Sequence, residues 1–271
     1  HHGRTPPCTK AILEAGIKRV VYATQDNNPV ASGGGNFLRD NGIDVLSGLR
    51  DSEAREFNHV FFTHILLGRP HVTLKVAQTI NAKVARKDRS SQWITCFDAR
   101  KDVHRERSLN QAILVGKGTL LADDPALNVR HVKGPSPTPV IIDSVGDIPS
   151  DLRIFKNPNT LLFSTFKSPK ISNEVIQFEK NLSRLDQWEF MFNTLKSRGI
   201  ISLYVEGGRM INSFLLNNNL VDCLHLYIGP KFFASDGIDS FKLSRELPFR
   251  LKSSKTIGNS VKLIYMRGLA E

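Results

Sequence analysis

Short apolar runs alternate with segments of helical spacing along most of this chain. The runs at 112–116, 202–206 and 223–228 are rich in strand-forming residues, and stretches such as 97–107 have helical periodicity. Parallel strands need a long crossover connection, which is usually a helix. The alternation therefore predicts an α/β fold with a mostly parallel sheet covered by helices on both faces.

The same periodicity places the other elements. We expect helices over 9–15, 37–41, 52–63, 97–107, 187–198 and 210–216, and strands over 19–24, 43–46, 72–77, 112–116, 140–143, 160–164, 202–206, 223–228 and 261–265. Ser52 is the expected N-cap of its helix. Proline cannot continue a helix, so the Gly68-Arg69-Pro70 break predicts a domain boundary that separates 1–69 from 70–271.

The composition of the chain limits the classes of binding partner that it can have. The net charge of +11 would suit nucleic acid, but the basic clusters at 86–89 and 100–107 lack the interleaved aromatic residues on which bases stack. A solvated basic face and attraction of small phosphorylated ligands both fit better. No apolar run approaches the ~20 residues needed to cross a membrane. Three widely spaced cysteines favour a reducing compartment, and we expect a cytoplasmic protein.

Glycines follow the apolar run at 202–205. Glu206, Gly207 and Gly208 stand between this strand and the next helical segment. A turn of this kind exposes backbone N–H groups at a helix start, where phosphate binds readily. The alternative is a simple tight turn, because the spacing is not that of a dinucleotide fingerprint.

A second glycine-rich stretch, 116–125, follows another strand and ends with Asp123-Asp124-Pro125. The aspartates could accept hydrogen bonds from ribose hydroxyls, or the stretch could be only a turn.

Trp93 is either a packing residue or a platform for a planar cofactor. Arg107 and Arg130 could hold phosphate through a bidentate fork, although a single arginine is more often a surface residue.

The chain opens with His1-His2-Gly3-Arg4-Thr5-Pro6-Pro7-Cys8. A zinc deaminase needs histidine and cysteine ligands and a glutamate that moves protons. Only Cys8 of this stretch offers a thiolate, and the paired Pro-Cys-x-x-Cys signature is absent. From its neighbours alone, an ordinary cysteine at the start of a helix is the better interpretation of Cys8.

Together these stretches resemble one family, the bifunctional riboflavin-biosynthesis deaminase/reductases. HHGRTPPCTKAILEAGIKRVVYATQDNNP resembles the second half of the family's deaminase domain. SQWIT, GKGTLLADDPALNVR, VIIDS, LYVEGG and LVDCLHLYIGPKFF resemble its reductase domain, in the same order. The resemblance implies a dihydrofolate-reductase-like reductase domain over 70–271, preceded over 1–69 by the C-terminal half of a cytidine-deaminase-like domain.

The resemblance also implies an activity. The reductase uses NADPH to reduce the ribosyl chain of a phosphorylated aminopyrimidine, 5-amino-6-(5-phosphoribosylamino)uracil, to ribityl. The resemblance assigns NADPH contacts to Ala77, Trp93, Thr119, Asp123, Ser144 and Gly208. It assigns substrate contacts to Ser91, Arg107, Leu127, Arg130 and Glu206. It also assigns catalytic roles to Asp123 and Glu206 and the role of a zinc ligand to Cys8. A homodimer through the reductase domain is implied as well. The other zinc ligands and the catalytic glutamate of the family are expected upstream of His1, so we expect no deamination by this chain.

One segment departs from the family. Where the family commonly has Ser-Leu-Asp-Gly before a basic residue, this chain has Thr79-Ile80-Asn81-Ala82. The loss of a carboxylate and of a flexible glycine predicts weakened turnover. A catalytically impaired module that binds NADP or a phosphosugar therefore stays open as an alternative, and a basic RNA-associated protein is a third.

Overall fold

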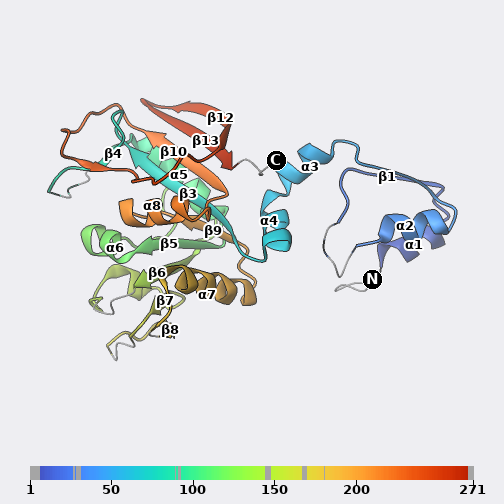
Figure 1. Cartoon of the computed structure of the whole chain (residues 1–271), viewed down its shortest axis with the longest axis horizontal. Helices are drawn as coiled ribbons and strands as arrows, with labels where there is room; N and C mark the ends of the chain where they lie inside the picture. The colour runs from blue at the N-terminus through green and yellow to red at the C-terminus, as the bar shows by residue number, and fades with distance from the viewer. Residues whose placement is uncertain are drawn as a thin grey trace. The chain divides into compact units, whose positions relative to one another are not determined.

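The computed structural model describes residues 7–26, 28, 32–88, 90, 93–143, 148–166, 170–179 and 181–267. The chain divides into two compact units, His1–His71 and Val72–Glu271, and each is treated by itself. Figure 1 shows the elements of both units.

The first unit is small and largely helical. Its elements are α1 (Cys8–Glu14), β1 (Arg19–Tyr22), α2 (Gly34–Asp40), β2 (Asp44–Ser47), α3 (Asp51–Phe57) and α4 (His59–Leu67), and β1 pairs with β2 in parallel. The single helix expected over 52–63 is wrong, because Asn58 separates two helices and its side-chain amide donates to the Ala54 carbonyl at the end of α3. Ser52 is not the N-cap either; Arg50 holds that position with a positive φ of 61°.

The second unit is built on a nine-stranded sheet with the order β12-β13-β10-β3-β9-β5-β6-β7-β8. These strands are β3 (His71–Gln78), β5 (Ala112–Gly116), β6 (Thr138–Asp143), β7 (Leu161–Ser164), β8 (Glu174–Gln177), β9 (Ser202–Val205), β10 (Cys223–Ile228), β12 (Phe249–Ile257) and β13 (Ser260–Arg267). The pairs β10–β3, β9–β5, β5–β6, β6–β7 and β7–β8 are parallel, whereas β13 is antiparallel to β10 and β12. The predicted α/β class with a mostly parallel sheet is confirmed.

Helices cover both faces of this sheet (Figure 1). They are α5 (Phe97–Ser108), α6 (Lys117–Asp123), α7 (Arg184–Ser197) and α8 (Arg209–Asn217), with a short 3₁₀ turn at Arg153–Lys156. A small pair, β4 (Lys83–Ala85) and β11 (Ile238–Asp239), lies outside the main sheet. The sequence predicted only a turn where α6 forms, and it missed β8 and β12, because their residues are too polar and exposed to form an apolar run.

The two faces of the sheet differ in chemistry because successive strand residues point to opposite sides. One face, here called the apolar face, buries residues such as Leu74, Leu114 and Val205 against α7 and α8. The opposite face packs against α5 and α6, and it carries charged and hydroxyl groups among its apolar residues. We call this second face the polar face; its polar members are Lys75, Tyr204, His225 and Tyr227 of the sheet, Asp102, Glu106 and Arg107 of α5, and Lys262 of β13.

Candidate active site

A buried ion pair lies at the end of β9. The Arg107 Nε and Nη2 donate to the two carboxylate oxygens of Glu206 at 2.6 and 3.0 Å. Both side chains are nearly buried, at 11% and 12% exposed. Lys75 adds a second cation, with its Nζ 3.5 Å from Glu206 Oε2. Three segments far apart in the sequence, in β3, in α5 and after β9, therefore meet at one carboxylate.

The neighbouring charges determine the protonation states of Glu206 and Arg107. Burial alone would raise the pKa of Glu206, but Arg107 and Lys75 outweigh burial and lower that pKa to about 2. Burial alone would lower the pKa of Arg107, and the Glu206 carboxylate reverses this so that the pKa is raised. Glu206 is thus an anion and Arg107 a cation at neutral pH.

The loop that follows α6 brings Arg130 to the same place. The Arg107 Nη1 donates to the Asn128 carbonyl at 3.0 Å, and the Arg130 Nη1 donates to Asn128 Oδ1 at 2.8 Å. Leu127 is buried at a positive φ of 48°, a conformation that costs a residue with a side chain roughly 1 kcal/mol. Arg130 itself is exposed. The loop therefore presents one solvent-accessible guanidinium beside the buried pair.

Two helices begin next to this carboxylate. Because β5 and β9 are parallel neighbours, α6 and α8 both begin at the same edge of the sheet. The N-caps of both helices are glycines, Gly116 and Gly208, and neither start has a side-chain cap. A Cβ on Gly207 would lie 2.7 Å from Ile211 Cγ2, so only glycine fits there. Bare backbone N–H groups at helix starts suit a phosphate, so the residues present fit a dinucleotide such as NADPH.

Thr119 and Asp123, both assigned to the cofactor, lie one turn apart on α6. A Cβ added to Gly208 would lie 3.3 Å from Thr119 Oγ1, so this threonine lies beside the start of α8. Asp123 is exposed at the last position of α6, and its carbonyl accepts from Arg153 Nη2 at 3.3 Å. The structure thus brings Thr119 and Gly208 together, while a contact between Asp123 and Glu206 is absent among the contacts described.

Trp93 and Ala77, also assigned to the cofactor, lie in two other segments of the second unit. Trp93 is 66% exposed, and the Arg100 guanidinium lies 3.7 Å from the centroid of its ring. The Trp93 carbonyl accepts from Lys231 Nζ at 2.8 Å. Ala77 is half-buried on β3, in register with Tyr227. Ser91, assigned to the substrate, and Ser144, assigned to NADPH, lie outside the described residues.

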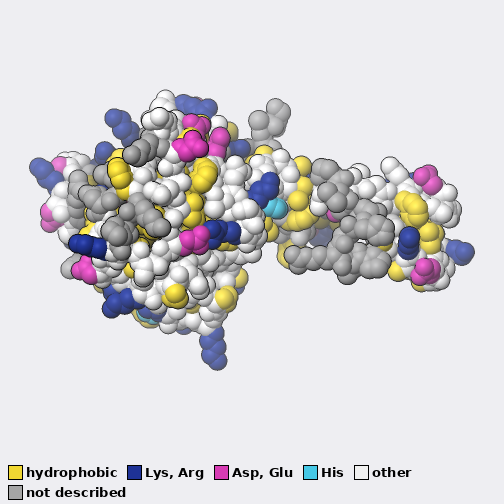
Figure 2. All heavy atoms as spheres, turned by 90° about the horizontal axis from the view of Figure 1, so that it is seen from below, with side chains coloured by type: hydrophobic (Ala, Val, Ile, Leu, Met, Phe, Trp, Pro, Cys, Tyr) yellow, Lys and Arg dark blue, Asp and Glu magenta, His cyan; other side chains and the backbone are white. Residues whose placement is uncertain are grey.

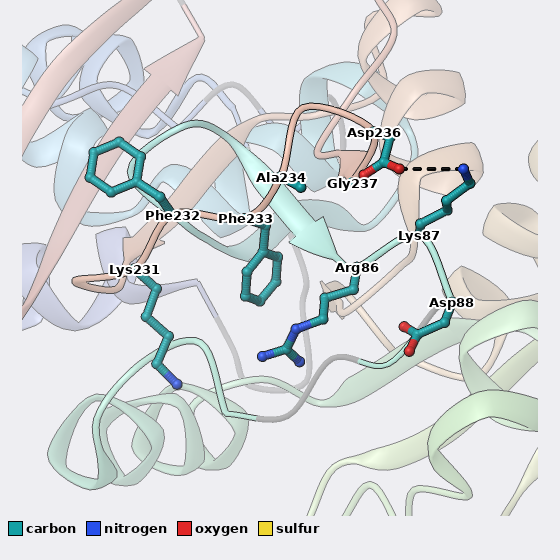
Figure 3. Close-up of a pocket in the computed structure, with 9 residues that line it drawn as sticks. All are labelled: Arg86, Lys87, Asp88, Lys231, Phe232, Phe233, Ala234, Asp236 and Gly237. Atoms are coloured by element: carbon teal, nitrogen blue, oxygen red, sulfur yellow. Dashed lines mark ion pairs between the residues drawn. The ribbon is translucent and has the colours of Figure 1, made fainter.

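A pocket of about 810 Å³ opens between the segment after β4 and the segment before β11. Figure 3 shows the side chains of Arg86, Lys231 and Phe233 around it, with the Lys87–Asp236 ion pair at one side. The Arg86 guanidinium lies 4.7 Å from the centroid of the Phe233 ring. Cations and aromatic rings of this kind suit an electron-rich or anionic ring.

The segment that departs from the expected family pattern forms a tight turn after β3. Asn81 makes three side-chain hydrogen bonds there: its Oδ1 accepts from Thr79 Oγ1 at 2.8 Å and from the Phe233 N–H at 3.2 Å, and its Nδ2 donates to the Phe233 carbonyl at 2.7 Å. Ala82 has a positive φ of 59°, which favours glycine. The concern that an alanine is strained at this position is therefore supported by the backbone.

Cys8 is an exposed free thiol at the start of α1. Among the described residues, no group of three or more histidine, cysteine and carboxylate side chains could hold a metal ion. These residues do not make a zinc site, and zinc takes no part in the reaction proposed below. Within the same described part of the chain, no helix has the length and hydropathy to span a membrane.

Three residues at this site were not found from the sequence. Asn128 lies in the stretch GKGTLLADDPALNVR, but nothing local marked it as a partner of Arg107 and Arg130, and His104 belongs to no motif. Lys75 had a signal: it is the one charged residue of the strand 72–77, and the alternation of that strand places it opposite the apolar side chains of Val72, Leu74 and Val76.

Comparisons with known proteins identify this arrangement. The family model of the RibD C-terminal domain matches residues 70–263. The riboflavin biosynthesis protein RibD of Aquifex aeolicus is 39% identical over 282 residues, which cover 98% of this chain and 78% of that protein. RibD of Escherichia coli is 34% identical over 287 residues, with 96% and 77% covered.

Solved structures of similar architecture point to the same family. The Thermotoga maritima diaminohydroxyphosphoribosylaminopyrimidine deaminase/5-amino-6-(5-phosphoribosylamino)uracil reductase has a TM-score of 0.84 at 31% identity, over 99% of this chain and 76% of that one. Acinetobacter baumannii RibD has a TM-score of 0.85 at 28% identity, over 99% and 78%. The family match, the long alignments and the shared architecture confirm the resemblance, and this chain belongs to the RibD family of riboflavin-biosynthesis proteins.

Proposed function

We propose that this chain reduces the ribosyl group of 5-amino-6-(5-phosphoribosylamino)uracil to ribityl with NADPH. The observation that carries the proposal is the buried Arg107–Glu206 pair beside the exposed Arg130, at the sheet edge where α8 begins without a side-chain cap. An anion, a phosphate-binding cation and a dinucleotide-binding helix start are the three features that this reaction needs.

NADPH, when bound, supplies the hydride that reduces C1 of the sugar. The α8 start at Gly208, together with Thr119, would hold its phosphates, and Trp93 offers an exposed ring face. The protein contributes mainly orientation and electrostatics in such a reaction. Asp123 remains a proposed contact to the cofactor.

Glu206 acts in this proposal as an anion and not as an acid. Its pKa of about 2 keeps it ionised at neutral pH, so it stabilises positive charge that develops at C1 when the sugar ring opens. Lys75 lies beside this carboxylate, with its Nζ 3.5 Å from Glu206 Oε2.

The two arginines take different roles. Three of the five N–H groups of Arg107 are already committed to Glu206 and to the Asn128 carbonyl. Arg130 is exposed, and one nitrogen of its guanidinium, Nη1, donates to Asn128 Oδ1. We therefore assign the 5-phosphate of the substrate chiefly to Arg130, and to Arg107 the orientation of Glu206.

The test is oxidation of NADPH by the purified chain in the presence of the ribosyl substrate, followed at the nicotinamide absorbance. NADH serves as the comparison for cofactor preference. Substrate-dependent oxidation supports the proposal. Tight binding of NADPH and substrate without oxidation would instead support a catalytically impaired binding module, the alternative that strain at Ala82 favours.

The RNA-associated alternative has a separate test. Lys and Arg side chains are dispersed over the face shown in Figure 2, with acidic side chains between them. RNA binding that weakens steeply with salt and is unaffected by NADPH would support that alternative.

Three finer assignments belong to this proposal. Residues 1–69 would form part of a deaminase domain with Cys8 as a zinc ligand, and residues 70–271 the reductase domain. The reductase domain would form a homodimer, which sedimentation of the purified chain tests. The cytoplasmic location expected from the cysteines is the third.

A further inference from the structure

We propose that His104 is a positioning residue that holds the phosphate-binding loop, and with it Arg130, by accepting a backbone hydrogen bond on its Nδ1. The inference rests on the proposed function, because it gives a mechanical basis to the role assigned to Arg130.

The contact is direct. The Arg130 backbone N–H donates to His104 Nδ1 at 3.2 Å. His104 lies on α5 one turn before Arg107, and it is only 5% exposed. This hydrogen bond therefore ties the loop to the helix that also supplies the partner of Glu206.

The loop has few other ties at this point. Val129 N–H donates to Ser136 Oγ at 3.0 Å within the loop, whereas Arg107 Nη1 reaches the Asn128 carbonyl from α5. Leu127 is buried in a strained backbone conformation, so the ties must hold the loop against its relaxation. Among the described contacts, two α5 side chains, Arg107 and His104, hydrogen-bond to this loop, and a third, Phe97, packs edge-on against His131 with 5.3 Å between ring centroids.

The surroundings keep His104 neutral. Burial, and then the positive charges of Arg107, Arg130 and His131, lower its pKa to about 4, while Glu206 acts in the opposite direction. The His131 ring packs edge-on against it, with 4.6 Å between centroids. A neutral imidazole can accept on Nδ1, whereas a protonated one can only donate.

The experiment uses ribose 5-phosphate as the probe, because it carries the phosphate of the substrate without the pyrimidine. Its dissociation constant is measured by calorimetry for the wild type, His104→Gln and His104→Leu. Glutamine keeps an acceptor oxygen, and leucine removes it. We expect His104→Leu to weaken binding about tenfold, the effect of losing one hydrogen bond, and His104→Gln to stay within threefold of the wild type.

Steady-state kinetics separate positioning from general damage. For His104→Leu we expect KM for the substrate to rise about tenfold and KM for NADPH to stay unchanged, because the bond acts on the loop of Arg130. The matched control is His131→Gln, which removes the neighbouring imidazole and leaves the acceptor in place. Equal losses in His104→Gln and His104→Leu, or equal rises in both KM values, would overturn the proposal.

A pH series covers the case in which His104→Leu does not fold. The ratio of ribose 5-phosphate affinities, wild type over His104→Gln, should be constant from pH 8 to 6 and should fall as pH approaches 4. Titration of the phosphate affects both proteins and cancels in the ratio. A ratio that is flat down to pH 4 contradicts the proposal. Binding of ribose 5-phosphate needs no turnover, so a failure of reductase activity leaves this test intact.

Discussion

The apolar face and the polar face of the main sheet are built from the same strands, yet they differ in what they bury. Leu74, Leu114 and Val205 pack on one side against α7 and α8. On the other side Lys262 Nζ bonds to Asp102 at 2.8 Å and to Glu106 at 2.6 Å, beneath α5. The sheet therefore supports a hydrophobic core on one side and a network of buried charges on the other.

This division separates stability from function. Apolar burial stabilises in proportion to area and does not depend on direction. Buried charges are costly unless each is paired, and their net contribution to stability is small. The polar face thus adds little net stability, and one of its ion pairs, Arg107–Glu206, lies beside the start of α8, where we place the cofactor. We infer that the apolar face carries the fold and the polar face carries the chemistry.

The largest change in stability and activity is expected from removing one partner of the Arg107–Glu206 ion pair on the polar face. Arg107→Met leaves the Glu206 carboxylate buried with Lys75 alone, so we expect a loss of about 3–5 kcal/mol in the free energy of unfolding. We also expect about a hundredfold loss in kcat/KM, because Glu206 loses its orientation. Urea denaturation and NADPH oxidation measure the two effects.

The double variant Arg107→Met/Glu206→Gln sharpens that result. It should recover part of the stability, since no carboxylate remains buried, but none of the activity. A double variant as unstable as Arg107→Met would show that the ion pair does not account for the loss.

On the apolar face, Leu114→Ala should reduce the free energy of unfolding by roughly 2–4 kcal/mol, because it leaves a cavity in a fully buried part of the core. KM for the substrate should not change in the folded fraction. Leu109→Ala, at a leucine that is 67% exposed, is the matched control and should cost under about 0.5 kcal/mol. A large change in KM for Leu114→Ala would contradict the separation of the two faces.

The two faces also differ in how far the sequence predicts them. The apolar face follows from period-two alternation and helical spacing, and the strand at 223–228 was predicted with its observed bounds. The glycine turn before α8 was predicted as well, because glycines between a strand and a helix are a local signal.

The polar face could not be predicted in the same way. That Arg107 and Glu206 lie within 2.6 Å depends on the order of strands in the sheet, which no local pattern records. His104 and Asn128 act through a loop whose course is set by tertiary contacts. Residues at such positions look like ordinary helix or loop residues until the sheet brings them together.

Lowering the pH should reduce the contribution that Glu206 of the polar face makes to the free energy of unfolding. The pKa of Glu206 in the folded chain, about 2, lies below its ordinary value of 4.5, so its contribution to stability is present in full above about pH 5. That contribution is lost as pH falls from there toward 2, and we expect it to be about 3 kcal/mol. The difference in unfolding free energy between the wild type and Glu206→Gln isolates it. A difference that does not shrink with falling pH would mean that Glu206 is not held ionised.

The smallest effect is expected at the turn after β3, which belongs to neither face. Ala82 has a φ of 59°, where a Cβ is strained and glycine is not. Ala82→Gly should therefore raise the free energy of unfolding by about 0.5–1 kcal/mol, measured by urea denaturation. Ala85→Gly on β4 is the matched control, and it should lower that free energy, because its backbone is extended and strand glycine costs entropy. If Ala82→Gly also raises kcat, the strain at this turn limits turnover; if it destabilises the chain, the turn tolerates alanine and the departure from the family pattern carries no penalty.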